Sequence, residues 1–162
     1  MISEAAKERM RAAVAKYPVA RSALLPVLRI AQEEEGYVTA DGLQAAADII
    51  GIKVDEAQTV ASFYAMYFQH PVGKKVVKVC TSISCYLRDC DKLMQQLATD
   101  LDVKPGQTTA DGQFTLLGVE CLASCGTAPV LQVNDEFEEN VSLDRARELV
   151  AEWKQAVPAS QA

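Results

Sequence analysis

The chain has 162 residues, of which 49% are hydrophobic and 23% charged, and its net charge is −6. This size predicts one domain or two small ones, and the composition excludes long disorder. Nucleic acids and anionic membrane surfaces attract clustered Lys and Arg, yet residues 1–72 (7 basic, 9 acidic) and 73–162 (9 basic, 13 acidic) are both acidic. We therefore expect no nucleic acid partner. Neither a bilayer-spanning apolar stretch nor a signal peptide is visible, so we expect a cytoplasmic protein without direct membrane insertion.

Residues 1–72 are expected to form a small helical bundle. Apolar side chains recur at three- and four-residue steps in four segments, namely 4–16, 22–36, 39–51 and 55–67. Thr39 is a suitable N-cap for the third helix, and Gly36 and Gly51 are expected to end the second and third helices. Four short helices in this length predict an N-terminal domain made only of helices.

The last of these predicted helices carries a group of aromatic residues. Phe63, Tyr64 and Tyr67 are expected on its buried side, whereas Phe68 is expected to be an exposed contact. His70 follows them and is the single histidine of the chain. One histidine without a partner does not fit a catalytic triad, and a Rieske centre needs two. We therefore expect His70 to be a surface or hinge residue.

Residues 73–162 are expected to form a second domain in which strands and helices are mixed. Strands are predicted at 75–79, 113–119, 128–133 and 137–141, and helices at 87–101 and 142–153. Ser142 is a suitable N-cap for the last helix. This order predicts a mixed four-stranded sheet with flanking helices, and it places the whole chain in the α+β or α/β class.

Four of the five cysteines form two pairs, and each pair follows a predicted strand. Four residues separate Cys80 from Cys85, and three separate Cys121 from Cys125. Neighbouring strand ends can bring four thiolates to one point, and soft thiolates are the ligands of iron–sulfur clusters. A structural zinc site is the main alternative, because it also uses four cysteines. A redox-active dithiol is less favoured, because the sequence has no Cys-x-x-Cys.

The fifth cysteine, Cys90, has two interpretations. It is either an alternative ligand in place of Cys85, or a core residue on the apolar face that also holds Leu87, Met94 and Leu97. The core interpretation is favoured, because a free cysteine commonly behaves as a small buried hydrophobe.

Two further patterns bear on chemistry. The glycines form neither G-x-G-x-x-G nor a P-loop, so no site for NAD, flavin or a nucleotide phosphate and no catalytic residue is expected on this chain. Acidic runs at 33–35, 135–136 and 138–139 either dock on a basic partner or are solvated faces, and the second interpretation is favoured.

The cysteine segments resemble those of the thioredoxin-like [2Fe–2S] ferredoxin family. The resemblance rests on CTSISCYLR at 80–88, GQTTADGQFTLL at 106–117, ECLASCGTAPV at 120–130 and VASFY at 60–64, so it covers almost the whole chain. The sequence departs from the family at two places. Asp89 and Cys90 stand where relatives often have a glycine and a residue other than cysteine, and Ala123 stands where a glycine is frequent.

The resemblance implies a helical N-terminal domain, at 1–72, followed by a thioredoxin-like domain, at 73–162, with one [2Fe–2S] cluster. The implied ligands are Cys80, Cys85, Cys121 and Cys125. The implied function is that of an electron-transfer subunit of bacterial NADH-quinone oxidoreductase, in its peripheral arm on the cytoplasmic face of the inner membrane.

The same resemblance places FMN and NADH on a partner subunit, whose flavin exchanges single electrons with the cluster, and it implies further iron–sulfur subunits. Two alternatives remain open. In the first, the chain is the equivalent subunit of a soluble NAD-linked hydrogenase or formate dehydrogenase. In the second, the chain is a zinc-stabilised adaptor module.

Overall fold

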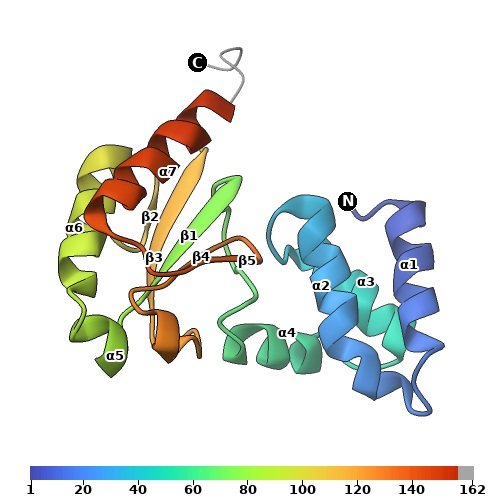
Figure 1. Cartoon of the computed structure of the whole chain (residues 1–162). Coiled ribbons are helices and arrows are strands. Elements are labelled where there is room, and N and C mark those ends of the chain that lie inside the picture. The colour runs from blue at the N-terminus through green and yellow to red at the C-terminus, as the bar shows by residue number, and fades with distance from the viewer. Residues whose placement is uncertain (157–162) are drawn as a thin grey trace. The chain divides into compact units, whose positions relative to one another are not determined.

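The computed structural model describes residues 1–156, and residues 157–162 lie outside this description. The chain forms two compact units, of which the first is Met1–Pro71 and the second begins at Val72. Each unit has a separate core of buried hydrophobic residues. Helices alone build the first unit, whereas a sheet with helices builds the second (Figure 1), which confirms the predicted α+β class.

The helices of the first unit follow one another with short connections. They are α1 (Glu4–Val14), a 3-10 helix (Ala20–Ala23), α2 (Leu24–Glu35), α3 (Ala40–Ile50) and α4 (Val54–Phe63). The predicted cap of α3 is confirmed, because the Thr39 hydroxyl accepts a hydrogen bond of 3.0 Å from the Gly42 N–H. The predicted ends of α2 and α3 are confirmed too. Gly36 and Gly51 follow these helices with φ angles of 80° and 79°, which a residue without Cβ adopts at least cost.

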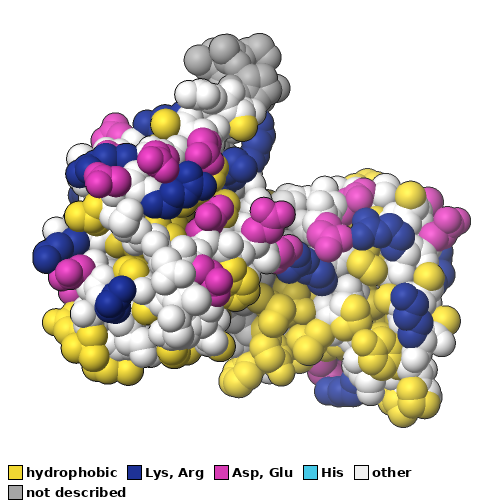
Figure 2. All heavy atoms as spheres, in the orientation of Figure 1, with side chains coloured by type: hydrophobic (Ala, Val, Ile, Leu, Met, Phe, Trp, Pro, Cys, Tyr) yellow, Lys and Arg dark blue, Asp and Glu magenta, His cyan; other side chains and the backbone are white. Residues whose placement is uncertain are grey.

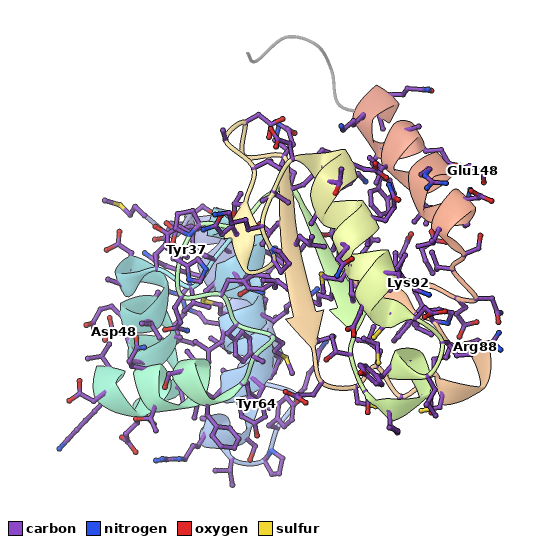
Figure 3. The ribbon with its side chains drawn as sticks, turned by 90° about the vertical axis from the view of Figure 1, so that its left-hand side faces the viewer. Tyr37, Asp48, Tyr64, Arg88, Lys92 and Glu148 are labelled. Carbon is purple, nitrogen blue, oxygen red and sulfur yellow. The ribbon has the colours of Figure 1, made fainter. Side chains whose placement is uncertain are left out.

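The aromatic residues at the end of α4 and just beyond it correct the prediction that three of them share a buried face. Phe63 is 79% exposed and Tyr64 37% exposed, whereas Tyr67 is 5% exposed and donates a hydrogen bond to the Leu25 carbonyl. The reason is that Ala57 and Ala61 form the buried face of α4 and Phe63 lies on the opposite side of the helix, whereas the extended Tyr64 beyond its last turn no longer follows helical spacing (Figure 3). The predicted exposure of Phe68 is wrong as well, because this residue is half-buried.

The second unit contains a five-stranded sheet in the order β2-β3-β1-β4-β5. Its strands are β1 (Lys75–Cys80), β2 (Gln107–Thr108), β3 (Phe114–Val119), β4 (Leu131–Val133) and β5 (Glu136–Glu138). The prediction of four strands is therefore wrong by one. The missed strand, β2, has only two residues, and so short a segment carries no alternation of polar and apolar side chains.

Helices also belong to the second unit and contribute to its core. They are α5 (Ile83–Tyr86), α6 (Cys90–Leu101), a 3-10 helix (Cys125–Thr127) and α7 (Leu143–Ala156). Both views place α6 and α7 on the same face of the sheet (Figures 1 and 3). The predicted cap of α7 is confirmed, because the Arg145 N–H donates to the Ser142 hydroxyl at 3.1 Å. No helix within residues 1–156 combines the length and the apolar character needed to cross a bilayer.

The two central strands determine where the cysteines lie. β1 and β3 are parallel and α6 belongs to the connection between them, so both strands end at the same edge of the sheet. The pairing aligns Cys80, the last residue of β1, with Val119, the last residue of β3. β1 is also buried, with Val77 and Val79 fully enclosed. The sheet thus fixes the start of both cysteine-bearing loops.

Candidate metal centre

Three segments of the second unit meet at the end of β1. The Thr81 N–H donates to the Val119 carbonyl at 2.8 Å, which holds the chain after β1 beside the end of β3. The Cys80 N–H donates to the Val130 carbonyl at 3.1 Å, which brings the segment before β4 to the same place. Cys121 follows β3 by only two residues. The loops that carry both cysteine pairs therefore start or end at one edge of the sheet.

Cys80 is buried, yet its surroundings favour the thiolate. Burial alone raises the pKa of this thiol, but the backbone N–H groups of Ser82 and Leu122 donate to the sulfur and lower it. The thiols of Cys85 and Cys121 also donate to it, and the net pKa of Cys80 lies below its usual value. Both cysteine loops thus contribute hydrogen bonds to one sulfur.

Cys85 is the second buried member of the site, at 2% exposed, and it lies on the single turn of α5. Burial is the largest cause that raises the pKa of this thiol to about 11, and its hydrogen bond with Cys80 raises it further. The Val130 N–H acts in the opposite direction. In the metal-free protein Cys85 is therefore a thiol at neutral pH.

The second pair lies in a loop and in a short helix, and both of its cysteines are exposed. The Ala123 N–H donates to the Cys121 sulfur at 3.3 Å. Ala123 has a positive φ of 59°, a conformation that glycine adopts at lower cost. Cys125 opens the 3-10 helix Cys125–Thr127. Local hydrogen bonds, rather than burial, shape this half of the site.

The structure brings the four predicted cysteines to the same region. Cys80, Cys85 and Cys125 line one small cavity, together with Ser82, Ser84, Ser124 and Val130. Cys121 joins them through its contact with Cys80. The role of these four thiols as ligands stays a prediction.

The donor set can be compared with the needs of the two metal centres that the sequence leaves open. A structural zinc site needs four ligands around one ion. A [2Fe–2S] cluster asks for two thiolates at each of two irons, and therefore for two separated pairs of soft donors. The paired thiols and the N–H groups directed at them fit the cluster.

Cys90 interacts electrostatically with Cys80 and Cys85 but does not line the cavity that they share with Cys125. It is 1% exposed and packs in the hydrophobic core of the second unit, so its predicted burial is confirmed. Burial also raises the pKa of its thiol. Leu87, which the sequence analysis placed on the same apolar face, is 75% exposed. That placement is wrong because α6 begins only at Cys90, so Leu87 precedes the helix whose apolar face it was assigned to.

An exposed apolar patch surrounds α5. Ile83, Tyr86 and Leu87 are 68%, 57% and 75% exposed, and Figure 2 shows hydrophobic side chains gathered over this helix. All three are within three residues of Cys85. We call Ile83, Tyr86 and Leu87 the α5 patch.

A carboxylate that the sequence pattern does not single out lies beside the second pair. One oxygen of Glu139 accepts hydrogen bonds from the hydroxyls of Ser124 and Thr127, which lie on either side of Cys125. The only sequence signal for Glu139 is its place in an acidic run, and such a run favours a solvated face.

A sheet whose two central, parallel strands end in cysteine-bearing loops defines a class of small iron–sulfur proteins with a thioredoxin-like fold. The chain belongs to the family described as thioredoxin-like [2Fe-2S] ferredoxin, whose pattern matches residues 10–154. This family carries a [2Fe–2S] cluster, which is the metal centre that the paired thiols fit.

Individual proteins with known names resemble the chain over most of its length. A subunit of the NADH-quinone oxidoreductase of Rhizobium meliloti is 37% identical over 93% of this chain and 89% of its own length. NADH-quinone oxidoreductase subunit 2 of Thermus thermophilus is 42% identical over 85% of this chain and 77% of its own length.

A solved structure resembles the fold. A crystal structure of an NAD+-reducing [NiFe]-hydrogenase in the air-oxidized state superposes with a TM-score of 0.74 at 22% identity, over 85% of this chain and 24% of that chain. At this identity the likeness concerns the fold alone.

Proposed function

We propose that the chain is an electron-transfer subunit of an NADH-quinone oxidoreductase and that Cys80, Cys85, Cys121 and Cys125 hold its [2Fe–2S] cluster. The observation that carries the proposal is the arrangement of two thiol pairs at one edge of the sheet. The names of the relatives with 37% and 42% identity support the host complex. The compact units correspond, on this proposal, to a helical domain at 1–72 and a ferredoxin domain at 73–162.

The residues around the thiols control the redox properties of the site. When bound, the cluster accepts and releases one electron at a time. Backbone N–H groups of Ser82, Leu122 and Ala123 donate to the sulfurs of Cys80 and Cys121, and such bonds raise a reduction potential. Burial of the first pair limits the access of water to one side of the site.

The electron partner is a separate subunit on this proposal. No nucleotide-binding motif is present in the sequence, so a flavin- and NADH-binding subunit oxidises NADH, and further iron–sulfur subunits complete the chain of carriers. This chain supplies no catalytic side chain of its own. Its place is the peripheral arm, on the cytoplasmic face of the membrane.

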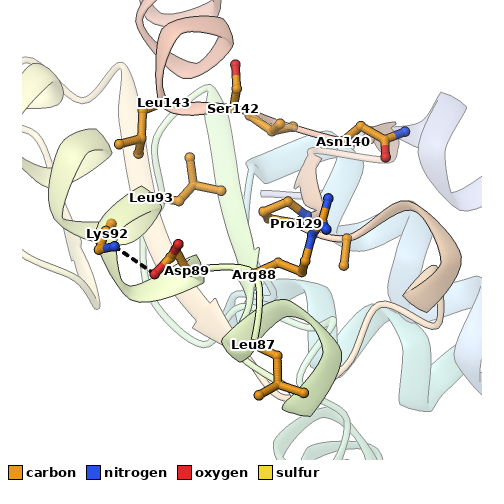
Figure 4. Close-up of a pocket in the computed structure, with 11 residues that line it drawn as sticks. Leu87, Arg88, Asp89, Lys92, Leu93, Pro129, Asn140, Ser142 and Leu143 are labelled. Atoms are coloured by element: carbon orange, nitrogen blue, oxygen red, sulfur yellow. Dashed lines mark ion pairs between the residues drawn. The ribbon is translucent and has the colours of Figure 1, made fainter.

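The α5 patch and the groove beside it are proposed as the docking face for that flavin-binding subunit. A groove of about 500 Å³ lies between the start of α6 and the segment before α7, with Leu87 and Leu143 along it (Figure 4). Arg88 lies in the same groove and forms no ion pair within residues 1–156, whereas its neighbour Lys92 pairs with Asp89 at 2.8 Å. An apolar segment that ends in a carboxylate complements this surface.

The test of the cluster is anaerobic purification of the full chain, followed by iron and acid-labile sulfide analysis and EPR after reduction with dithionite. We expect equal amounts of iron and sulfide, and a spectrum of one reduced [2Fe–2S] centre. Zinc without sulfide would instead favour the adaptor module.

The host complex is tested by co-purification from the native cell. A flavin-containing partner together with quinone-reducing activity supports the proposal, whereas a hydrogenase or formate dehydrogenase partner contradicts it. Leu87→Glu is expected to abolish co-purification without changing the iron content. Val19→Glu, at a residue of the first unit that is 59% exposed, is the matched control.

A further inference from the structure

Glu139 holds the turn that presents Cys125. Its oxygen Oε1 accepts from the Ser124 hydroxyl and, at 2.8 Å, from the Thr127 hydroxyl, and the two hydroxyl oxygens are themselves 2.8 Å apart. The backbone adds a second connection, because the Asn140 N–H donates to the Thr127 carbonyl at 2.7 Å. The segment after β5 is thus connected to both ends of the short helix that begins with Cys125.

In this arrangement the hydroxyl hydrogens of Ser124 and Thr127 are both engaged in hydrogen bonds. A serine or threonine hydroxyl has a single hydrogen to donate. The acceptors that these two hydroxyls contact are Glu139 Oε1, each other and the Ser124 carbonyl oxygen, so neither hydrogen is directed at a sulfur atom of Cys125. Hydrogen bonds to cluster sulfurs raise a reduction potential, so their diversion to a carboxylate keeps it lower.

Glu139 also supplies a negative charge. The hydrogen bonds from Ser124 and Thr127 lower the pKa of its carboxyl group, so it is ionised at neutral pH. No Lys or Arg forms an ion pair with it in the part of the chain that the structure describes. Reduction adds negative charge to a cluster, and an uncompensated carboxylate beside the site opposes that step.

We propose that Glu139 is a positioning residue that orients the Cys125 turn through the Ser124 and Thr127 hydroxyls and keeps the reduction potential of the cluster low. The proposal rests on the ligand set proposed above. It assigns a redox role to a carboxylate outside the cysteine motif.

The experiment compares three full-length proteins: the wild type, Glu139→Gln and Glu136→Gln. Glutamine keeps the size and one acceptor oxygen of Glu139 but removes its charge and weakens its hold on the hydroxyls. Glu136 is the matched control, because it is an exposed carboxylate of β5 without a hydrogen bond to this turn within residues 1–156. The midpoint potential is measured by EPR-monitored titration, with iron and sulfide content beside it.

We expect Glu139→Gln to retain iron and sulfide and to have a more positive midpoint potential than the wild type, with a clearly smaller change in Glu136→Gln. Equal shifts in the two variants, or no shift in Glu139→Gln, overturn the proposal. A wild-type protein without iron and sulfide contradicts the proposed cluster itself, so the two failures are distinguishable.

A second measurement is used if the Glu139→Gln variant does not incorporate iron and sulfide. In the metal-free protein, alkylation of Cys125 is followed by peptide mapping, with Cys121 as the internal reference. Losing a hydrogen bond of ordinary strength is expected to make Cys125 react roughly fivefold faster relative to Cys121. An unchanged ratio overturns the positioning role.

Discussion

The two cysteine pairs of the proposed site are built in opposite ways. Cys80 and Cys85 are 4% and 2% exposed and belong to the central strand and to the helix after it. Cys121 and Cys125 are exposed and belong to a loop and a short 3-10 turn. The hydrophobic core therefore holds one half of the site in place, whereas the other half depends on individual hydrogen bonds. This difference predicts that the same substitution has different consequences in the two pairs.

The largest expected difference concerns metal content. Cys85→Ser is expected to abolish the cluster, because a serine oxygen is a harder and shorter ligand and the rigid buried pair cannot move toward the iron. Cys121→Ser is expected to lower the iron content without abolishing it, because its exposed loop can adjust. Iron, sulfide and visible absorbance of the purified variants test this. Full iron occupancy in either variant would contradict the ligand assignment.

Stability of the metal-free protein sharpens the same comparison. A hydroxyl at position 85 is buried with poorer hydrogen bonding than in water, so Cys85→Ser is expected to lower the free energy of unfolding by about 2 kcal/mol. Cys121→Ser, at an exposed position, is expected to change it by less than about 0.5 kcal/mol. Urea denaturation of both metal-free variants measures the two values. Similar losses would show that both pairs are equally embedded.

The buried pair is also expected to differ from the exposed pair in how stability depends on alkaline pH. The folded state holds the Cys85 proton up to a pKa of about 11, against a usual thiol value of 9.0, so this thiol stabilises the metal-free protein below pH 9. The contribution is lost as pH rises from 9 to 11, because the unfolded chain releases the proton first. The stability difference between wild type and Cys85→Ala should therefore shrink by roughly 1–2 kcal/mol over this range. If urea denaturation gives the same difference in free energy of unfolding between the two proteins at pH 9 and pH 11, the raised pKa of Cys85 is contradicted.

The smallest effect on the metal centre is expected at Cys90, which is buried but outside both pairs. Cys90→Ala removes a packed sulfur from the core and is expected to lower the free energy of unfolding by about 1 kcal/mol. The visible spectrum and iron content are expected to stay unchanged. A bleached Cys90→Ala protein would show that Cys90 is a ligand and that the site does not consist of the two pairs alone.

Local signals explain what the sequence predicts well. Thr39 and Ser142 cap helices through their own hydroxyls, and Gly36 ends α2 through its own backbone. The predicted strand 113–119 agrees with β3 to one residue, because an apolar run follows a turn at Asp111. The convergence of the cysteines was also predictable, since parallel neighbours end at one edge.

Long-range contacts explain which features the sequence does not predict. The exposure of Phe63 depends on which face of α4 packs on the core, and that face is formed by Ala57 and Ala61 rather than by the aromatic residues. The partners of Glu139 are hydroxyls on a different loop, and no local pattern connects them. An acidic residue in a charged run therefore looks the same in the sequence whether it is solvated or holds a turn.

The parallel pairing of β1 with β3 also has a consequence for biosynthesis. Parallel strands cannot be joined by a tight turn, so α6 and β2 are translated between the first cysteine loop and the second. A nascent chain that has just left the ribosome at Cys85 offers half of the proposed ligands. Insertion of iron and sulfide must then wait until the ribosome has passed Cys125 and β3 has docked beside β1, which makes cofactor loading a step of the completed sheet.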